Sequence, residues 1–152
     1  MSETFALRPA TIRDVEPIAF AELELFPDEA WTVFQLAEEI EHPDRRYVVA
    51  VDQDGPEELR GYAGIMLAGD TADLHTIGAL VEGRGIGRAL LAWCEQAACD
   101  GGAQRMLLEV REDNDRARSF YRRAGYQEIG RRGGYYRIRG RSIDAIVMER
   151  AL

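Results

Sequence analysis

The sequence of 152 residues contains no lysine, only two cysteines and two histidines, and no long apolar run. The absence of lysine excludes a P-loop nucleotide-binding protein, because the Walker motif requires a lysine after its last glycine. Cys94 and Cys99 lie five residues apart in one helical pattern, and neither has a histidine at metal-ligand spacing, so we expect reduced packing cysteines and no metal. No apolar run approaches the ~18 residues of a membrane span, and the N-terminus lacks a signal-peptide pattern. We therefore expect a cytoplasmic protein with no membrane partner.

Charge is distributed unevenly along the chain. Residues 1–83 carry 5 Arg and 18 acidic residues, whereas residues 84–152 carry 14 Arg and 9 acidic residues. A basic half suits a polyanionic cofactor and an acidic half suits a cationic substrate, although solvated helix faces can sort charge in the same way without any function. The net charge of −8 argues against nucleic acid as a partner.

Apolar periodicity and turn residues predict a single domain over residues 1–152, of α/β (α+β) class, with a mixed sheet flanked by helices. Strands are expected at 5–8, 47–51, 61–67, 72–81, 106–110, 126–130 and 143–148, with an Arg/Gly/Tyr-rich loop between the last two. Helices are expected from Thr11, from Thr32, over 85–100 and over 114–124. The nearly continuous apolar run at 106–110 is typical of a strand buried on both faces.

A glycine-rich turn at residues 83–88 (Gly-Arg-Gly-Ile-Gly-Arg) follows the strand at 72–81 and opens the strongest predicted helix. Such a turn presents free backbone N–H groups and the positive end of the helix dipole to one point, and arginines at its rim add charge. The pattern indicates a phosphate-binding loop. It does not match the dinucleotide fingerprint, because the sixth position counted from Gly83 or Gly85 is Arg88 or Leu90 rather than glycine.

Three residues further along have the chemistry of a catalytic site. Glu109 interrupts the apolar run, and a buried carboxylate with a raised pKa suits a general base acting on an amine. The alternatives are that Glu109 lies on the solvent-exposed face of an alternating strand, or that it forms an ion pair with Arg111. Asn114 and Tyr121 are seven residues apart and share a helix face, yet Asn114 also suits a simple helix cap and Tyr121 a packed core ring. A phenol titrates near a thiol, so Tyr121 also suits a general acid for a leaving thiolate.

These motifs together resemble the GNAT acyltransferases. The turn matches their acetyl-CoA pyrophosphate loop, R/Q-x-x-G-x-G/A, at Gly85 and Gly87, but Glu82 stands where the family carries Arg or Gln, and the preceding stretch is about two residues shorter. Residues 107–126 resemble the block L-E-V-R-x-x-N-x-x-A-x-x-x-Y-x-x-x-G-F/Y. The segments 26–31, 131–136 and 144–148 are similar to those of one branch, the ribosomal-protein alanine N-acetyltransferases of the RimI type.

The resemblance implies a GNAT acyl-CoA N-acyltransferase fold, with a mostly antiparallel central sheet, and direct acetyl transfer from acetyl-CoA to an amine. It implies that Glu109 is the base and Tyr121 the acid, and that the acceptor is the N-terminal amine of a protein, such as a ribosomal protein. The implied cofactor-binding residues are Ile77, Gly78 and Ala79 (backbone, pantetheine), Gly83, Arg84, Gly85, Ile86, Gly87 and Arg88 (pyrophosphate), and Asn114. The implied peptide-groove residues are Trp31, Tyr135 and Tyr136.

Two other functions remain open at this point. The first keeps the fold but changes the acceptor to a lysine side chain or a small-molecule amine, such as a polyamine or an antibiotic. The second is a catalytically silent acetyl-CoA-binding module, which Glu82 in the phosphate loop also fits. A deep closed acceptor pocket would favour a small molecule, and an open groove between Trp31 and Tyr135 would favour a peptide. The sequence gives no indication of the oligomeric state.

Overall fold

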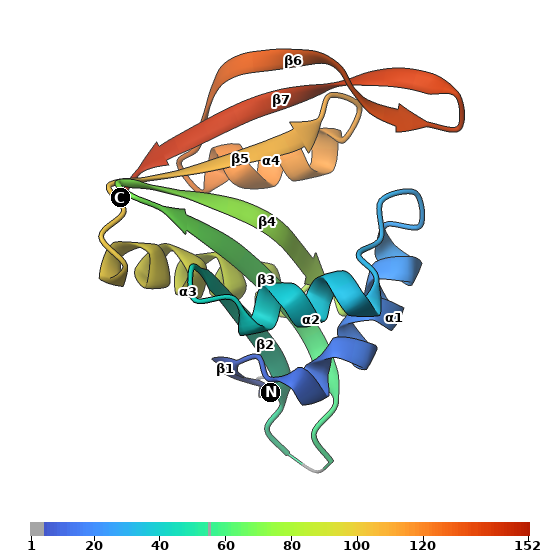
Figure 1. Ribbon diagram of the computed structural model, residues 1–152, viewed down its shortest axis with the longest axis vertical. Coiled ribbons are helices and arrows are strands. Elements are labelled where there is room, and N and C mark those ends of the chain that lie inside the picture. Colours follow the sequence, from blue (N-terminus) through green and yellow to red (C-terminus); the bar gives the residue numbers. More distant parts are fainter. Residues whose placement is uncertain (1–4, 55) are drawn as a thin grey trace.

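The computed structural model describes residues 5–54 and 56–152, in which seven strands form one sheet with helices on both faces (Figure 1). The elements in chain order are β1 (Phe5–Pro9), a 3-10 turn (Ile12–Asp14), α1 (Val15–Leu25), α2 (Val33–Glu41), β2 (Arg45–Asp52), β3 (Leu59–Ala68), β4 (Thr71–Ala79), α3 (Ile86–Asp100), β5 (Arg105–Arg111), α4 (Asp115–Arg123), β6 (Gln127–Ile138) and β7 (Arg141–Ala151). The predicted mixed sheet flanked by helices is confirmed.

The strand order is β1-β2-β3-β4-β5-β7-β6, and every neighbouring pair is antiparallel except β4 and β5. These two parallel strands pair only where residues 71–73 meet residues 105–107. Beyond that point residues 74–79 of β4 have no ladder pairing with β5, and the two strands diverge (Figure 1). One edge of β4 is therefore left open toward β5, whereas its other edge is paired with β3.

Two apolar cores lie on opposite faces of the sheet, as strand β2 illustrates. Val48 and Ala50 are buried in the core beneath α3, whereas Val49 and Val51 are buried in the core beneath α1 and α2. Alternate side chains of a strand point to opposite faces, so a run of apolar residues is needed when both faces are covered. Burial of Cys94 in the first core was expected, but the packing role predicted for Cys99 is wrong, because its side chain is exposed.

Strand β5 is covered less completely than predicted. Met106, Leu108 and Val110 are buried, but Leu107 and Glu109 are only half-buried, so the expectation of burial on both faces is wrong. The physical reason is that α3 packs on one face of β5, whereas α1 and α2 pack on β2, β3 and β4. The face of β5 that carries Glu109 therefore remains partly open.

The segment predicted as an Arg/Gly/Tyr-rich loop is instead part of a strand. Residues 131–136 belong to β6, which pairs with β7 through two register shifts. The hairpin closes at Arg139 and Gly140, whose φ values of 52° and 77° are those of a tight turn matched to strand twist. Almost every side chain of β6 is exposed, so the strand lacks the alternation of apolar residues that would have revealed it.

Across 5–54 and 56–152, no helix is both long and apolar enough to cross a bilayer. Within the same ranges no three His, Cys, Asp or Glu side chains are grouped so as to hold a metal ion.

Candidate active site

The glycine-rich turn forms one wall of a pocket of about 330 Å³, and α4 forms the other. The turn lies at the end of β4 that diverges from β5, and it precedes the 15-residue helix α3. Gly83 and Gly85 have φ values of 77° and 76°, a backbone conformation that side chains with a Cβ rarely adopt. The residues of the predicted phosphate loop that line the pocket are Gly83, Gly85, Ile86, Gly87 and Arg88.

Arg84 is the one residue of the predicted loop that the structure does not bring to the pocket. Together with Arg60, whose guanidinium donates to Asp52, it lowers the pKa of the Asp52 carboxyl at the end of β2. The positive charges at the pocket come instead from Arg88 and from two residues of α4, Arg116 and Arg123. Neither of the α4 arginines was identified from the sequence.

Residues 77–79 lie on the open part of β4. Gly78 pairs with Tyr62 on β3, and a Cβ at Gly78 would lie 2.7 Å from the Tyr62 ring, so only glycine fits there. The other edge of Ile77, Gly78 and Ala79 faces the space between β4 and β5, and Ala79 reaches the pocket. An extended ligand arm can add to such an edge as a strand would.

Glu109 lies on β5 beyond the last residue that pairs with β4. Its side chain is 27% exposed, and Oε1 lies 3.5 Å from Nη2 of Arg132. The other oxygen, Oε2, is buried and accepts no hydrogen bond from the described residues. The predicted alternative of an ion pair with Arg111 is wrong, because Arg111 pairs with Asp113 at 2.9 Å. A buried carboxylate oxygen without a donor is costly unless a ligand supplies one.

Tyr121 lies on α4 and is buried on the α3 side of the sheet, 7% exposed. Its ring packs edge-on against Phe120 and Tyr126, and burial raises the pKa of its phenol, with a smaller effect of Cys94. Tyr136 on β6 makes a smaller contribution to the same shift.

Asn114 caps α4, which is one of the two roles predicted for it, the other being a contact with the cofactor. Its Oδ1 accepts a hydrogen bond of 3.1 Å from the backbone N–H of Ala117. This contact satisfies one of the free N–H groups of the first helical turn.

The residues of the predicted acceptor groove come from two segments that face each other. Trp31 lies in the loop between α1 and α2, and its ring stacks on His75 with centroids 5.9 Å apart. Tyr135 and Tyr136 lie on β6, in edge-to-face contact at 5.1 Å. The loop and the β6–β7 hairpin approach each other where Asp28 meets Arg139 at 3.7 Å.

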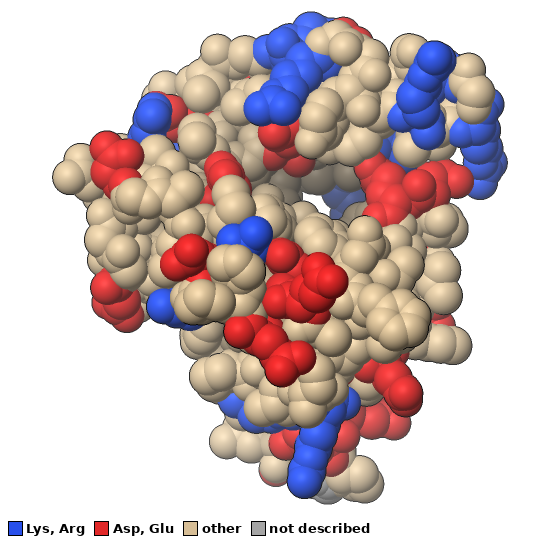
Figure 2. Space-filling model, in the orientation of Figure 1, with Lys and Arg blue, Asp and Glu red and all other residues tan. Residues whose placement is uncertain are grey.

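A hollow lies between the β6–β7 hairpin and the rest of the molecule, with acidic side chains on its border (Figure 2). Partial burial raises the pKa of Glu29 in the α1–α2 loop; Arg111 opposes this shift, and the carboxylates of Asp28 and Glu22 add to it. Burial also raises the pKa of Tyr136, and Glu29 and Glu109 contribute to that shift. This cluster of carboxylates suits a cationic amine.

Known proteins similar to this chain show the family to which it belongs. Residues 11–126 match the Acetyltransferase (GNAT) family. The chain belongs to the GNAT acetyltransferase family. It is 38% identical to the N-alpha-acetyltransferase RimI of Mycobacterium tuberculosis, over 98% of this chain and 94% of that protein, so the predicted resemblance to the RimI type is confirmed.

Solved structures show the same GNAT fold at lower identity. Crystal structures of Arabidopsis thaliana NAA60 with a bisubstrate analogue and with acetyl-CoA have TM-scores of 0.89 and 0.88 at 21% and 20% identity, covering 98% of this chain and 99% of theirs. The ribosomal-protein-S18-alanine N-acetyltransferase of Escherichia coli has a TM-score of 0.86 at 21% identity, covering 97% of this chain and 94% of that one.

The sequence did not reveal the buried carboxylate of Glu22, which lies beneath the loop that carries Trp31. Glu22 on α1 is 1% exposed and accepts hydrogen bonds from the Tyr62 hydroxyl, from the Thr76 hydroxyl at 3.0 Å and from the Trp31 backbone N–H at 3.1 Å. It therefore joins α1, β3 and β4 to the loop that carries Trp31. The available signal was its position one turn after Ile18, on the apolar face of α1.

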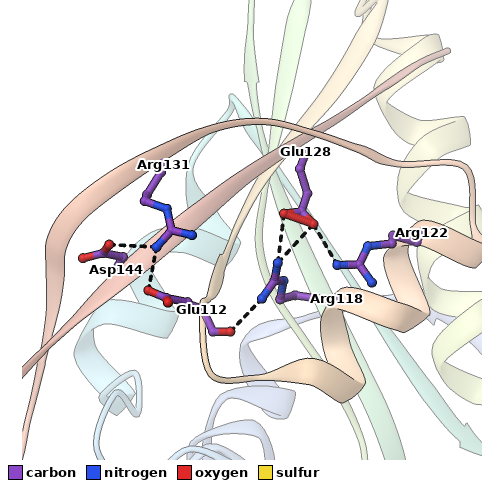
Figure 3. A network of polar contacts seen from close by, with 6 residues as sticks. All are labelled: Glu112, Arg118, Arg122, Glu128, Arg131 and Asp144. Atoms are coloured by element: carbon purple, nitrogen blue, oxygen red, sulfur yellow. Dashed lines mark hydrogen bonds and ion pairs between the residues drawn. The ribbon is translucent and has the colours of Figure 1, made fainter.

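A network of charged residues holds α4 against the hairpin (Figure 3). Glu128 on β6 accepts from Arg118 and Arg122 of α4, and Arg131 of β6 donates to Asp144 of β7 and to Glu112. Exposed pairs of this kind are individually weak. Part of the positive charge of the second half of the chain is thus neutralised by carboxylates of the protein itself.

Proposed function

We propose that this GNAT enzyme transfers the acetyl group of acetyl-CoA directly to the N-terminal α-amine of a protein, with ribosomal proteins as the substrate class. The observation that carries the proposal is the position of Glu109. It lies where β4 and β5 diverge, with one buried oxygen that lacks a donor among the described residues. A carboxylate in this setting is poised to accept a proton from an amine.

The cofactor side supports acetyl-CoA as the donor. The open edge of residues 77–79 suits the amide-containing pantetheine arm, which would pair with it as an added strand. The glycine turn and the arginines of the pocket suit the diphosphate at the far end of that arm. Asn114, at the start of α4, would lie beside the same ligand.

The chemistry needs one base and one acid. Glu109 would take a proton from the α-ammonium, directly or through water, so that the nitrogen lone pair attacks the thioester carbonyl. The new N–C bond forms as the C–S bond breaks, and Tyr121 would give its phenolic proton to the thiolate. The second proton of the acylated nitrogen would then leave through solvent and return the tyrosinate to its phenol form. Tyr121 carries its proton at neutral pH, as a general acid must, although burial raises the pKa of its phenol and makes it a weaker acid than an exposed tyrosine. Cys94 is a poor nucleophile, since burial also raises the pKa of its thiol, which agrees with direct transfer.

The acceptor side supports a peptide. Trp31, Tyr135 and Tyr136 would line the groove, and the carboxylates of Asp28 and Glu29 would attract a cationic terminus. The similarity to a protein named as an N-alpha-acetyltransferase over nearly the whole of both chains points to the same acceptor class.

The test is acetyl transfer to three acceptors, followed by mass spectrometry of the products. The first is a peptide with a free Ala-Arg terminus, the second a peptide with a blocked terminus and one internal lysine, and the third spermidine. Transfer to the first peptide alone is the expected result. Transfer to the blocked peptide or to spermidine would replace the proposal with a lysine or small-molecule enzyme, and binding of acetyl-CoA without any transfer would indicate a silent module.

A further inference from the structure

Glu82 is the residue at which the phosphate loop departs from the GNAT pattern, and the structure gives it a partner across the pocket. Its Oε1 lies 2.5 Å from Nη1 of Arg116 on α4. Both side chains are largely exposed, and both residues line the pocket formed by the glycine turn. The contact joins the β4–α3 turn to α4, the two walls of the pocket.

A carboxylate at this position opposes the binding of a diphosphate. Like charges a few ångströms apart in partly solvated surroundings repel with an energy that corresponds to about a tenfold change in affinity. The Arg116 guanidinium lowers the pKa of Glu82 through its hydrogen bond, so Glu82 is fully ionised at neutral pH and the repulsion cannot be removed by protonation.

The position of Arg116 is unfavourable for the helix that carries it. Arg116 is the second residue of α4, at the positive end of the helix dipole, where acidic side chains such as that of Asp115 are preferred. The pair with Glu82 offsets this cost, since it places the guanidinium toward the pocket rather than over its own helix.

We propose that Arg116 belongs to the cofactor site of this chain, where it neutralises Glu82 from α4 and so removes the repulsion that this carboxylate would exert on the diphosphate. Glu82 and Arg116 together then take the place of the single Arg or Gln that the family carries in the loop. With Glu82 neutralised, Arg88 and Arg123 give the pocket its net positive charge toward the diphosphate. The inference rests on the proposed use of acetyl-CoA and specifies how the anionic end of that ligand is held.

The test is a double-mutant cycle on the dissociation constant for acetyl-CoA, measured by calorimetry without any acceptor. Arg116→Gln should raise the Kd about tenfold, because it leaves Glu82 uncompensated. Glu82→Gln alone should lower the Kd by no more than about threefold. In the Glu82→Gln background, Arg116→Gln should raise the Kd by at most about threefold, and Arg116→Lys in the native background should stay within about threefold of the unsubstituted protein.

Two charge-matched controls separate a local effect from a change in net charge. Arg105→Gln removes a cation at the opposite end of β4, beside Thr71, and Glu57→Gln removes an anion that pairs with Arg8. Both should leave the Kd unchanged. The same cycle with 3′-dephospho-acetyl-CoA should give the same differences if Arg116 serves the diphosphate; differences confined to acetyl-CoA would assign Arg116 to the 3′-phosphate and overturn the inference.

Failure of the inference can be distinguished from failure of the proposed function. An unsubstituted protein that binds and transfers acetyl groups normally, with an equal effect of Arg116→Gln in both backgrounds, would overturn only the role of the pair. An unsubstituted protein that binds no acetyl-CoA would overturn both. A melting temperature measured for each variant without ligand shows that any change in Kd comes from a folded protein.

Discussion

Individual residues of the site differ in how their surroundings suit them to proton transfer. One carboxylate oxygen of Glu109 lies near Arg132, and the other is buried and accepts no hydrogen bond from the described residues. This second oxygen can therefore accept a proton from a ligand. Tyr121 is enclosed by aromatic rings in the α3 core, and burial holds its proton in place. In the proposed mechanism the half-open carboxylate takes the role of base and the enclosed phenol that of acid.

Replacing Glu109 with glutamine should lower kcat/KM for the free-terminus peptide by about a hundredfold at pH 7, within the range typical of general bases. The defect should shrink as the pH rises above about 8, because an α-amine with a pKa of about 7.7–8.0 then loses its proton to water without help. The measurement is the pH dependence of kcat/KM for both proteins, with Glu149→Gln on β7 as a control. A defect of equal size at pH 7 and pH 9.5 would remove Glu109 from the role of base.

Replacing Tyr121 with phenylalanine should lower kcat by about a hundredfold and leave the Kd for acetyl-CoA nearly unchanged. The matched control is Tyr126→Phe, since Tyr126 is also buried and packs against Tyr121, but its hydroxyl donates to Glu95 on α3. The control substitution should lower the free energy of unfolding by about 1 kcal/mol and leave kcat unchanged. Equal turnover in Tyr121→Phe and the unsubstituted enzyme would make Tyr121 a core residue only.

Among the structural elements, those with local signals could be predicted from the sequence, and those made by distant contacts could not. The capping box of Thr32 and Gln35 and the helix after Gly85 depend on neighbouring residues and were predicted correctly. Strand β6 is stabilised by pairing with β7 rather than by an apolar face of its own, so its middle was wrongly predicted as a loop. The pair of Glu82 and Arg116 likewise arises only because the crossover through α3 brings β4 and α4 together.

The loop between α1 and α2 is held to the body of the protein in part by the Glu22 side chain, which accepts a hydrogen bond from the Trp31 backbone N–H. Glu22→Gln should weaken the hydrogen bond that the Trp31 backbone N–H donates to residue 22. The KM for the peptide should rise several-fold, and the free energy of unfolding should fall by about 1–3 kcal/mol. The Kd for acetyl-CoA should stay within about twofold. Tyr62→Phe removes one donor to Glu22 but keeps the contact with Trp31, so it should cost stability with a smaller change in KM. Loss of stability with an unchanged KM in Glu22→Gln would show that Glu22 supports the core alone.

At the scale of the whole molecule, a basic pocket and an acidic hollow lie in different parts of the fold. The glycine pocket lies where α3 and α4 approach each other, and acidic groups gather around the hollow below the β6–β7 hairpin (Figure 2). The divergence of β4 from β5 connects the two, so an acyl donor and a cationic acceptor can approach the same opening from opposite sides. The acidic first half of the sequence thus contributes carboxylates beside the hollow, and the basic second half contributes the arginines of the pocket. Most arginines of the β6–β7 hairpin are paired with carboxylates of the protein.

The stability of the whole molecule should depend on pH through Glu39 on α2, whose carboxylate contacts residues of β2 and β4. Its carboxylate accepts hydrogen bonds from Tyr47 and Arg45 and contacts His75 at 2.8 Å. Burial raises the pKa of Glu39, but His75, Tyr47 and Arg45 together outweigh it and hold the pKa below the usual 4.5. The stabilisation is therefore complete above about pH 4.5 and is lost as the pH falls through the lower folded-state pKa.

Glu39→Gln should consequently lower the free energy of unfolding at pH 7 by about 2 kcal/mol, as expected for a charged acceptor with several donors. The difference from the unsubstituted protein should shrink as the pH falls below about 4.5, because the unfolded chain of that protein then binds a proton at Glu39 more readily than the folded one. Urea unfolding between pH 3.5 and pH 7.5 measures both proteins, with Glu38→Gln as a control on the exposed side of the same helix. A difference that stayed constant across this range would show that Glu39 stabilises the fold through packing alone, and that its ionisation is not coupled to folding.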